Sequence, residues 1–97
     1  MPVAPLEHRT TIRVIYAGRV QGVNFRWTTR EIAVGFPVTG FVRNLADGTV
    51  ELVTRGTPPS VRGFLDAVAT RFQNHITHAD EAPCVVDEEF ESFEIRH

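Results

Sequence analysis

The sequence predicts an α+β sandwich in which an antiparallel sheet carries two helices on one face. Two segments with the apolar spacing of amphipathic helices lie among segments in which apolar and polar residues alternate, as they do in strands. Asp47-Gly48 stands between two of the strand-like segments and marks a hairpin. A chain of 97 residues is long enough for one compact domain and too short for two. We expect residues 11–97 to form that domain and residues 1–10 to be a flexible leader.

The first strand is expected over residues 11–17, TIRVIYA, where Ile12, Val14 and Tyr16 share one face. Such alternation is typical of a half-buried strand, because successive side chains point to opposite faces of a sheet. Gly18 follows and marks the start of a loop.

A helix is expected next, over NFRWTTREIAVGF, which begins at Asn24. Asn24 is a suitable N-cap, because a short polar side chain can accept a hydrogen bond from the free amides of the first turn. Gly35 stands near the C-terminal end of this segment, and Pro37 closes it.

The predicted hairpin consists of residues 38–45, VTGFVRNL, and residues 49–55, TVELVTR. By alternation, the row of the first strand that faces the helices ends in the polar residue Asn44. Phe41 should lie on the opposite face and be partly exposed.

The second helix should start at Pro58-Pro59, and its apolar stripe consists of Val61, Phe64, Leu65, Val68 and Phe72. Short strands are expected at residues 84–86, CVV, and 93–95, FEI. The order is therefore βαββαβ with a small extra strand at the end, which is the arrangement of a ferredoxin-like fold. In it the first two strands run parallel on either side of the third, so that their carboxyl ends meet at one edge of the sheet.

Composition narrows the classes of function. The net charge of −2 provides no general basic field for nucleic acid or an anionic membrane, and no apolar run is long enough to span a bilayer. Cys84 is the only cysteine, so that no disulfide can form within the chain and a reducing, cytoplasmic location is expected. No Cys/His spacing indicates a metal site. We expect a monomer without metal or cofactor.

The stretch GRVQGVNFR, residues 18–26, contains cations and glycines but no acid. A glycine-containing loop that enters a helix can direct backbone N–H groups at an anion. Arg26 falls in the first helical turn, where a cation is unfavourable unless an anion is bound beside it. Its planar guanidinium matches a phosphate in two parallel hydrogen bonds. Asn44 should face this loop across the shared sheet edge, although an Asn at a strand end can also be a simple turn former.

GRVQGVNFR, followed by TGFVRN, DGTVE and the closing FEIRH, closely resembles the acylphosphatase family over nearly the whole chain. This resemblance implies metal-independent hydrolysis of an acyl phosphate to a carboxylate and inorganic phosphate. The inorganic phosphate is expected to inhibit the reaction as well. It assigns phosphoryl binding to Arg26 and to loop amides, and the positioning of the attacking water to Asn44. The implied loop amides are those of Arg19, Val20, Gln21, Gly22 and Val23.

Other interpretations remain open at this point. The chain could be a non-catalytic module that binds acyl or carbamoyl phosphate, although it retains both Arg26 and Asn44. It could correspond to the acylphosphatase-like domain of larger carbamoyl-transfer proteins. A third reading, an RNA-binding sheet, is disfavoured by the acidic balance and by the outer face of the third strand, which carries Thr49, Glu51 and Val53.

Overall fold

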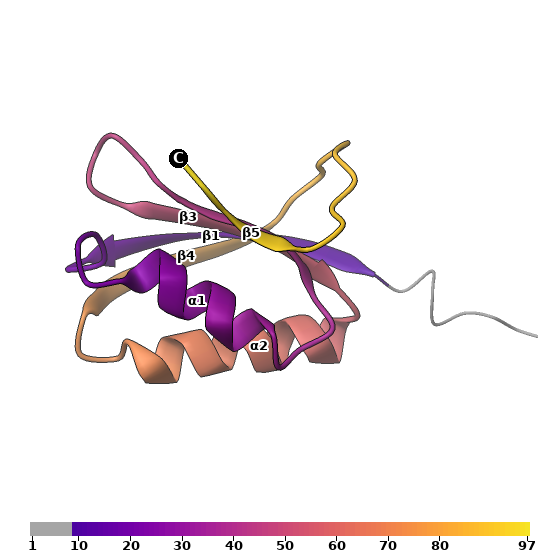
Figure 1. The fold of residues 1–97 in the computed structure, drawn as a ribbon, viewed down its shortest axis with the longest axis horizontal. Coiled ribbons are helices and arrows are strands. Elements are labelled where there is room, and N and C mark those ends of the chain that lie inside the picture. Colours follow the sequence, from indigo (N-terminus) through magenta and orange to yellow (C-terminus); the bar gives the residue numbers. More distant parts are fainter. Residues whose placement is uncertain (1–8) are drawn as a thin grey trace, which may run out of the picture.

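The computed structural model describes residues 9–97. Its elements are β1 (Thr10–Gly18), α1 (Phe25–Ala33), β2 (Thr39–Asn44), β3 (Val50–Gly56), α2 (Pro58–Arg71), β4 (Ile76–Pro83) and β5 (Phe93–Arg96). The strands form one sheet in the order β4-β1-β3-β2-β5, and both helices lie on the same face of it (Figure 1). The predicted βαββαβ order is confirmed. The leader expected at residues 1–10 lies mostly outside the described residues, and Thr10 already belongs to β1.

The sheet is mixed rather than wholly antiparallel. Neighbouring strands from β4 through β2 pair antiparallel, whereas β2 and β5 pair parallel. Because β1 and β2 each pair antiparallel with β3, they run parallel to one another, as expected. Tyr16 of β1 and Asn44 of β2 both pair with Val50, which lies between them. The ends of β1 and β2 therefore reach the same edge of the sheet.

The core lies between the sheet and the helices. The whole predicted stripe of α2 is buried, and α1 turns Phe25, Thr29 and Ala33 inward. Each fully buried large apolar side chain contributes about 1.5–3 kcal/mol through removal of its surface from water. Thr57 caps α2 by accepting a hydrogen bond from the Ser60 amide, so the start at Pro58-Pro59 is also confirmed.

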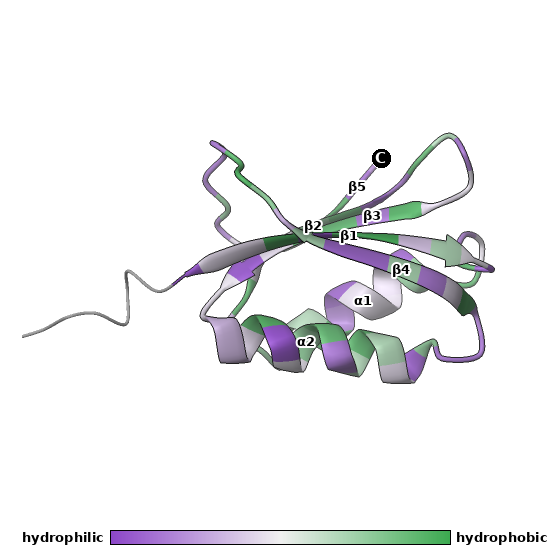
Figure 2. Ribbon diagram, turned by 180° about the vertical axis from the view of Figure 1, so that it is seen from behind, coloured by the Kyte–Doolittle hydropathy of each residue, from purple (hydrophilic) through white to green (hydrophobic). Residues whose placement is uncertain are grey.

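The fourth strand is not where the sequence analysis placed it. β4 covers residues 76–83, ITHADEAP, whereas residues 84–86 are not in a strand and Val85 is almost fully exposed. Within residues 9–97, β4 lies at the edge of the sheet and pairs with β1 alone, and its side chains are mostly exposed. It is largely hydrophilic in Figure 2. An edge strand held by backbone hydrogen bonds needs no apolar alternation, which explains why the pattern missed it.

The segment between β4 and β5 crosses the outer face of the sheet, the face opposite the helices. Phe90 from this segment lies edge-on to Phe41, and the Arg96 guanidinium stacks 4.2 Å from the Phe41 ring centroid. Phe41 is consequently buried, not partly exposed as its strand position alone indicated. Among residues 9–97, no helix is long and apolar enough to cross a membrane.

Candidate active site

The loop between β1 and α1 is anchored where it leaves β1. At Gly18, an added Cβ would lie 2.4 Å from the His75 carbonyl oxygen, so only glycine permits the close approach of the two backbones. Val20 is completely buried and attaches the loop to the core. The loop therefore has a fixed position relative to the sheet edge, which an anion site with directed amides requires.

The middle of the loop uses left-handed backbone conformations. Gly22 has φ 79° and Asn24 has φ 59°, and a Cβ added at Gly22 would meet no described atom within 4 Å. Asn24 is the N-cap residue of α1, as predicted, but its side chain makes no capping hydrogen bond. Its role is conformational, since Asn tolerates this backbone region better than most residues. The free amides of the first helical turn are thus left for another acceptor.

One of the predicted loop amides already donates a hydrogen bond to a protein acceptor, and the other four donate none among the described residues. The Arg19 amide donates to the His75 carbonyl oxygen at 2.9 Å, which links β1 to the start of β4. The amides of residues 20–23 donate to no backbone or side-chain acceptor among the described residues. Of the amides predicted to bind an anion, that of Arg19 therefore already has an acceptor, while those of Val20 through Val23 have none among the described residues.

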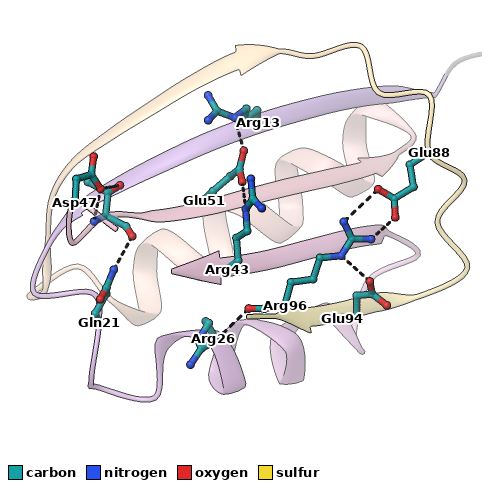
Figure 3. A network of polar contacts seen from close by, with 10 residues as sticks. Arg13, Gln21, Arg26, Arg43, Asp47, Glu51, Glu88, Glu94 and Arg96 are labelled. Carbon is teal, nitrogen blue, oxygen red and sulfur yellow. Dashed lines mark hydrogen bonds and ion pairs between the residues drawn. The ribbon is translucent and has the colours of Figure 1, made fainter. Parts of the chain in front are cut away.

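Arg26 lies in the first turn of α1 and points toward the end of β5 (Figure 3). Its Nη1 donates to the Arg96 carbonyl oxygen at 3.1 Å and lies 3.1 Å from Nδ1 of His97. No side-chain carboxylate within residues 9–97 forms an ion pair with it. These contacts orient the guanidinium and leave its charge without a protein counter-ion in the described chain.

Arg26 and Asn44 line the same open cleft, which has a volume of about 650 Å³. Asn44 is the last residue of β2 and is half-buried. Val20 and Gly22 of the loop also line the cleft. Its other lining residues include Phe93, Ile95 and His97 from β5 and the C-terminal end. The fold thus brings Arg26 and Asn44 to one cleft with two of the five predicted loop residues, whereas Arg19, Gln21 and Val23 do not line it.

The side chain of Gln21 connects the loop to the hairpin, which the sequence did not reveal. Its Nε2 donates to the carbonyl oxygens of Leu45 at 2.9 Å and Thr49 at 2.8 Å. Figure 3 shows Gln21 extending toward the hairpin at Asp47. The hairpin itself is tightened by Asp47, which accepts from the Thr49 hydroxyl and amide; these bonds lower the pKa of the Asp47 carboxyl. Gln21 therefore fixes the distance between the β1–α1 loop and the strand end that carries Asn44.

Comparisons with known proteins agree with this geometry. The acylphosphatase family model matches residues 12–95. The chain belongs to the acylphosphatase family. It is 37% identical to an acylphosphatase of Synechococcus sp. over 91 residues, which covers 94% of this chain and 97% of that protein. It is 33% identical to an acylphosphatase of Lactobacillus gasseri, over 88% of this chain and 96% of that one.

Solved structures give the same result. An acylphosphatase from Coxiella burnetii superimposes with a TM-score of 0.81 at 29% identity, over 98% of this chain and 100% of that chain. HypF of T. kodakarensis has a TM-score of 0.76 at 20% identity and is matched over only 12% of its length, so that this likeness concerns the fold alone. Family membership and these neighbours support the hydrolysis of acyl phosphates as the activity of the chain.

Proposed function

We propose that Arg26 and the loop amides of residues 20–23 bind the phosphoryl group of an acyl phosphate, and that Asn44 positions the attacking water. One observation carries this assignment. Arg26, which has no carboxylate partner in residues 9–97, and Asn44 line one cleft beside a loop in which the amides of residues 20–23 have no acceptor among those residues.

Binding of the phosphoryl group follows from charge and direction. The positive end of α1 and the loop N–H groups provide fixed dipoles, and Arg26 adds a full charge with donors in a planar fork. Because these groups are already in place before the substrate arrives, they stabilise the charge that spreads over the equatorial oxygens in the transition state. The occupied Arg19 amide is left out of this cradle, in contrast to the set that the resemblance implied.

Asn44 serves the attack rather than the binding. Its side-chain amide has both an acceptor and donors, so it can hold a water molecule in line with the phosphorus. The nucleophile needs positioning more than activation, because an acyl phosphate is a mixed anhydride whose carboxylate leaves with little protonation. Water forms the new P–O bond, the bond from phosphorus to the acyl oxygen breaks, and the proton of the water passes to a phosphate oxygen. The products are a carboxylate and inorganic phosphate.

The same proposal includes metal-independence, a monomeric state and a cytoplasmic location, with inorganic phosphate as product and competitive inhibitor. The test is hydrolysis of benzoyl phosphate by the full chain in the presence of a chelator. Turnover that saturates with substrate and is inhibited by phosphate is expected. Binding of phosphate without turnover would instead establish the alternative, a module that binds acyl or carbamoyl phosphate.

A further inference from the structure

The cleft is larger than a phosphoryl group needs, and its remaining wall has a distinct composition. Beyond Arg26, the outward side of α1 contributes Trp27 and Arg30, and the opposite wall includes Ser92, Phe93 and His97. Trp27 is 54% exposed, although it is the largest apolar side chain of the protein. An exposed aromatic residue inside a cleft, beside a cation, is typical of a ligand site. No motif in the sequence indicates where the acyl group would bind.

Arg30 is placed to meet a second anion. It follows Arg26 by four residues on α1, so the two side chains lie on the same side of the helix, about 6 Å apart along its axis. Its only carboxylate neighbour among the described residues is Glu31, at 3.8 Å, and both side chains of that pair are more than 40% exposed. Such a pair is weak and screened by water, so the charge of Arg30 remains largely available.

The acids near the cleft do not cancel this charge. Glu94 also lines the cleft, but its carboxylate accepts from Nε of Arg96 at 2.7 Å. Glu31 does not line the cleft. Arg26 and Arg30 therefore contribute positive charge to the cleft. Trp27, which also lines the cleft, lies between them in the sequence.

We propose that Trp27 and Arg30 form an acyl subsite that selects acyl phosphates whose acyl group carries its own carboxylate. The inference rests on the proposed function, because it assumes that the phosphoryl group lies at Arg26. The acyl chain then extends along α1 over Trp27, and its distal carboxylate pairs with Arg30. Neutral acyl groups still fit the cleft but lack this second pairing.

The test compares 4-carboxybenzoyl phosphate with benzoyl phosphate, which differ only in the distal carboxylate. In the wild-type protein, kcat/KM should be higher for the carboxylated substrate. Arg30→Gln should lower the ratio of the two kcat/KM values about 3- to 10-fold, mainly through KM, because the lost contact is present in both ground and transition states. Raising the ionic strength should lower the wild-type ratio in the same direction.

Two variants serve as controls. Arg71→Gln removes an exposed cation from α2 outside the cleft and should leave the ratio unchanged. Trp27→Ala should weaken both aromatic substrates by a similar factor, and so it should also leave the ratio near the wild-type value. If Arg30→Gln and Arg71→Gln lowered the ratio of the two kcat/KM values equally, the overall charge of the protein would explain the effect. That result would overturn the subsite.

A binding measurement separates this inference from the proposed function. Calorimetry with 4-carboxybenzylphosphonate and benzylphosphonate, which cannot release phosphate, should give an affinity ratio that also falls about 3- to 10-fold in Arg30→Gln. If the wild-type protein hydrolyses neither acyl phosphate but this affinity ratio still depends on Arg30, hydrolysis is refuted and the subsite stands. An affinity ratio that is the same in wild type and Arg30→Gln overturns the subsite, whatever the turnover.

Discussion

The arginines on the outer face of the sheet and those in the cleft lie in opposite electrostatic surroundings. On the outer face, Arg13 and Arg43 hold the two oxygens of the buried Glu51 at 2.6 and 2.5 Å. Arg96 is bound there by Glu88 and Glu94 (Figure 3). In the cleft, the polar partners of Arg26 within the described chain are one backbone carbonyl oxygen and one imidazole nitrogen. The charges of the outer-face arginines are thus used in ion pairs within the protein, whereas Arg26 has no carboxylate partner among residues 9–97.

Arg26→Ala is expected to have the largest effect on turnover. Loss of the guanidinium should lower kcat for benzoyl phosphate by about 10²–10³, the size found when a key donor to a transition-state oxyanion is removed. The matched control is Arg13→Ala, which removes a paired arginine of the outer face. Steady-state kinetics should show near-normal turnover for that control. If kcat fell by similar factors in Arg26→Ala and Arg13→Ala, the arginines of the cleft and of the outer face would not differ in their role in turnover.

Asn44→Ala should reduce turnover by about 10² while phosphate inhibition survives, because water positioning is lost and the anion site is not. The inhibition constant for inorganic phosphate and kcat are measured on the same variant. A parallel loss of both would make Asn44 a phosphate-binding or purely structural residue, and the strand end would then not belong to the reaction.

Glu51→Gln tests the outer face through stability. Burial opposes ionisation of Glu51, but the hydrogen bonds from Arg13 and Arg43 outweigh it and hold the pKa of the carboxyl below its usual value. A carboxyl with a depressed folded-state pKa stabilises the fold above the unfolded-state pKa of about 4.3, and this stability is lost as the pH falls through the folded-state value.

The expected result is therefore pH-dependent. At pH 7, urea unfolding of Glu51→Gln should show a free energy of unfolding lower by about 1–3 kcal/mol. The gap to wild type should narrow as the pH is lowered below about 4. Turnover per folded molecule should be retained. A gap that is constant with pH would show that the ionised form of Glu51 is not what stabilises the outer face.

Gln21→Ala should have the smallest effect of the series. It removes two hydrogen bonds between the loop and the hairpin, each worth about 1 kcal/mol net. Because these bonds align the β1–α1 loop with Asn44, kcat should fall by about 3- to 10-fold with little change in phosphate inhibition. Gln21→Glu, which keeps the length of the side chain but not its donors, should behave like the alanine variant. Full activity in both would limit Gln21 to a role in folding.

The sequence predicted the elements whose side chains form the core and missed those held by backbone or surface contacts. The stripe of α2 and the alternation in β1 reflect burial of one face, and such periodicity can be read directly. β4 has no such pattern, since its side chains point to water. The burial of Phe41 depends on the segment around Phe90, which is distant in sequence and has no local signal.

The site shows the same division. The placement of Arg26 and Asn44 in one cleft was predictable, because the loop, the helix start and the strand end have local signatures and the topology brings them to one edge. The engagement of the Arg19 amide by His75, the hydrogen bonds of the Gln21 side chain and the wall formed by Trp27 and Arg30 depend on three-dimensional neighbours. No spacing in the sequence encodes these contacts.

The central claim is that the counter-charge of Arg26 is a ligand, whereas that of the outer-face arginines is the protein itself. The most direct measurement is a titration with inorganic phosphate followed by NMR of the backbone amides and of the arginine Nε–H groups. The account predicts saturable shifts for residues 20–26 and for Nε of Arg26, with the Nε signals of Arg13, Arg43 and Arg96 unchanged. Shifts of similar size at all four guanidinium groups, or none at Arg26, would contradict it.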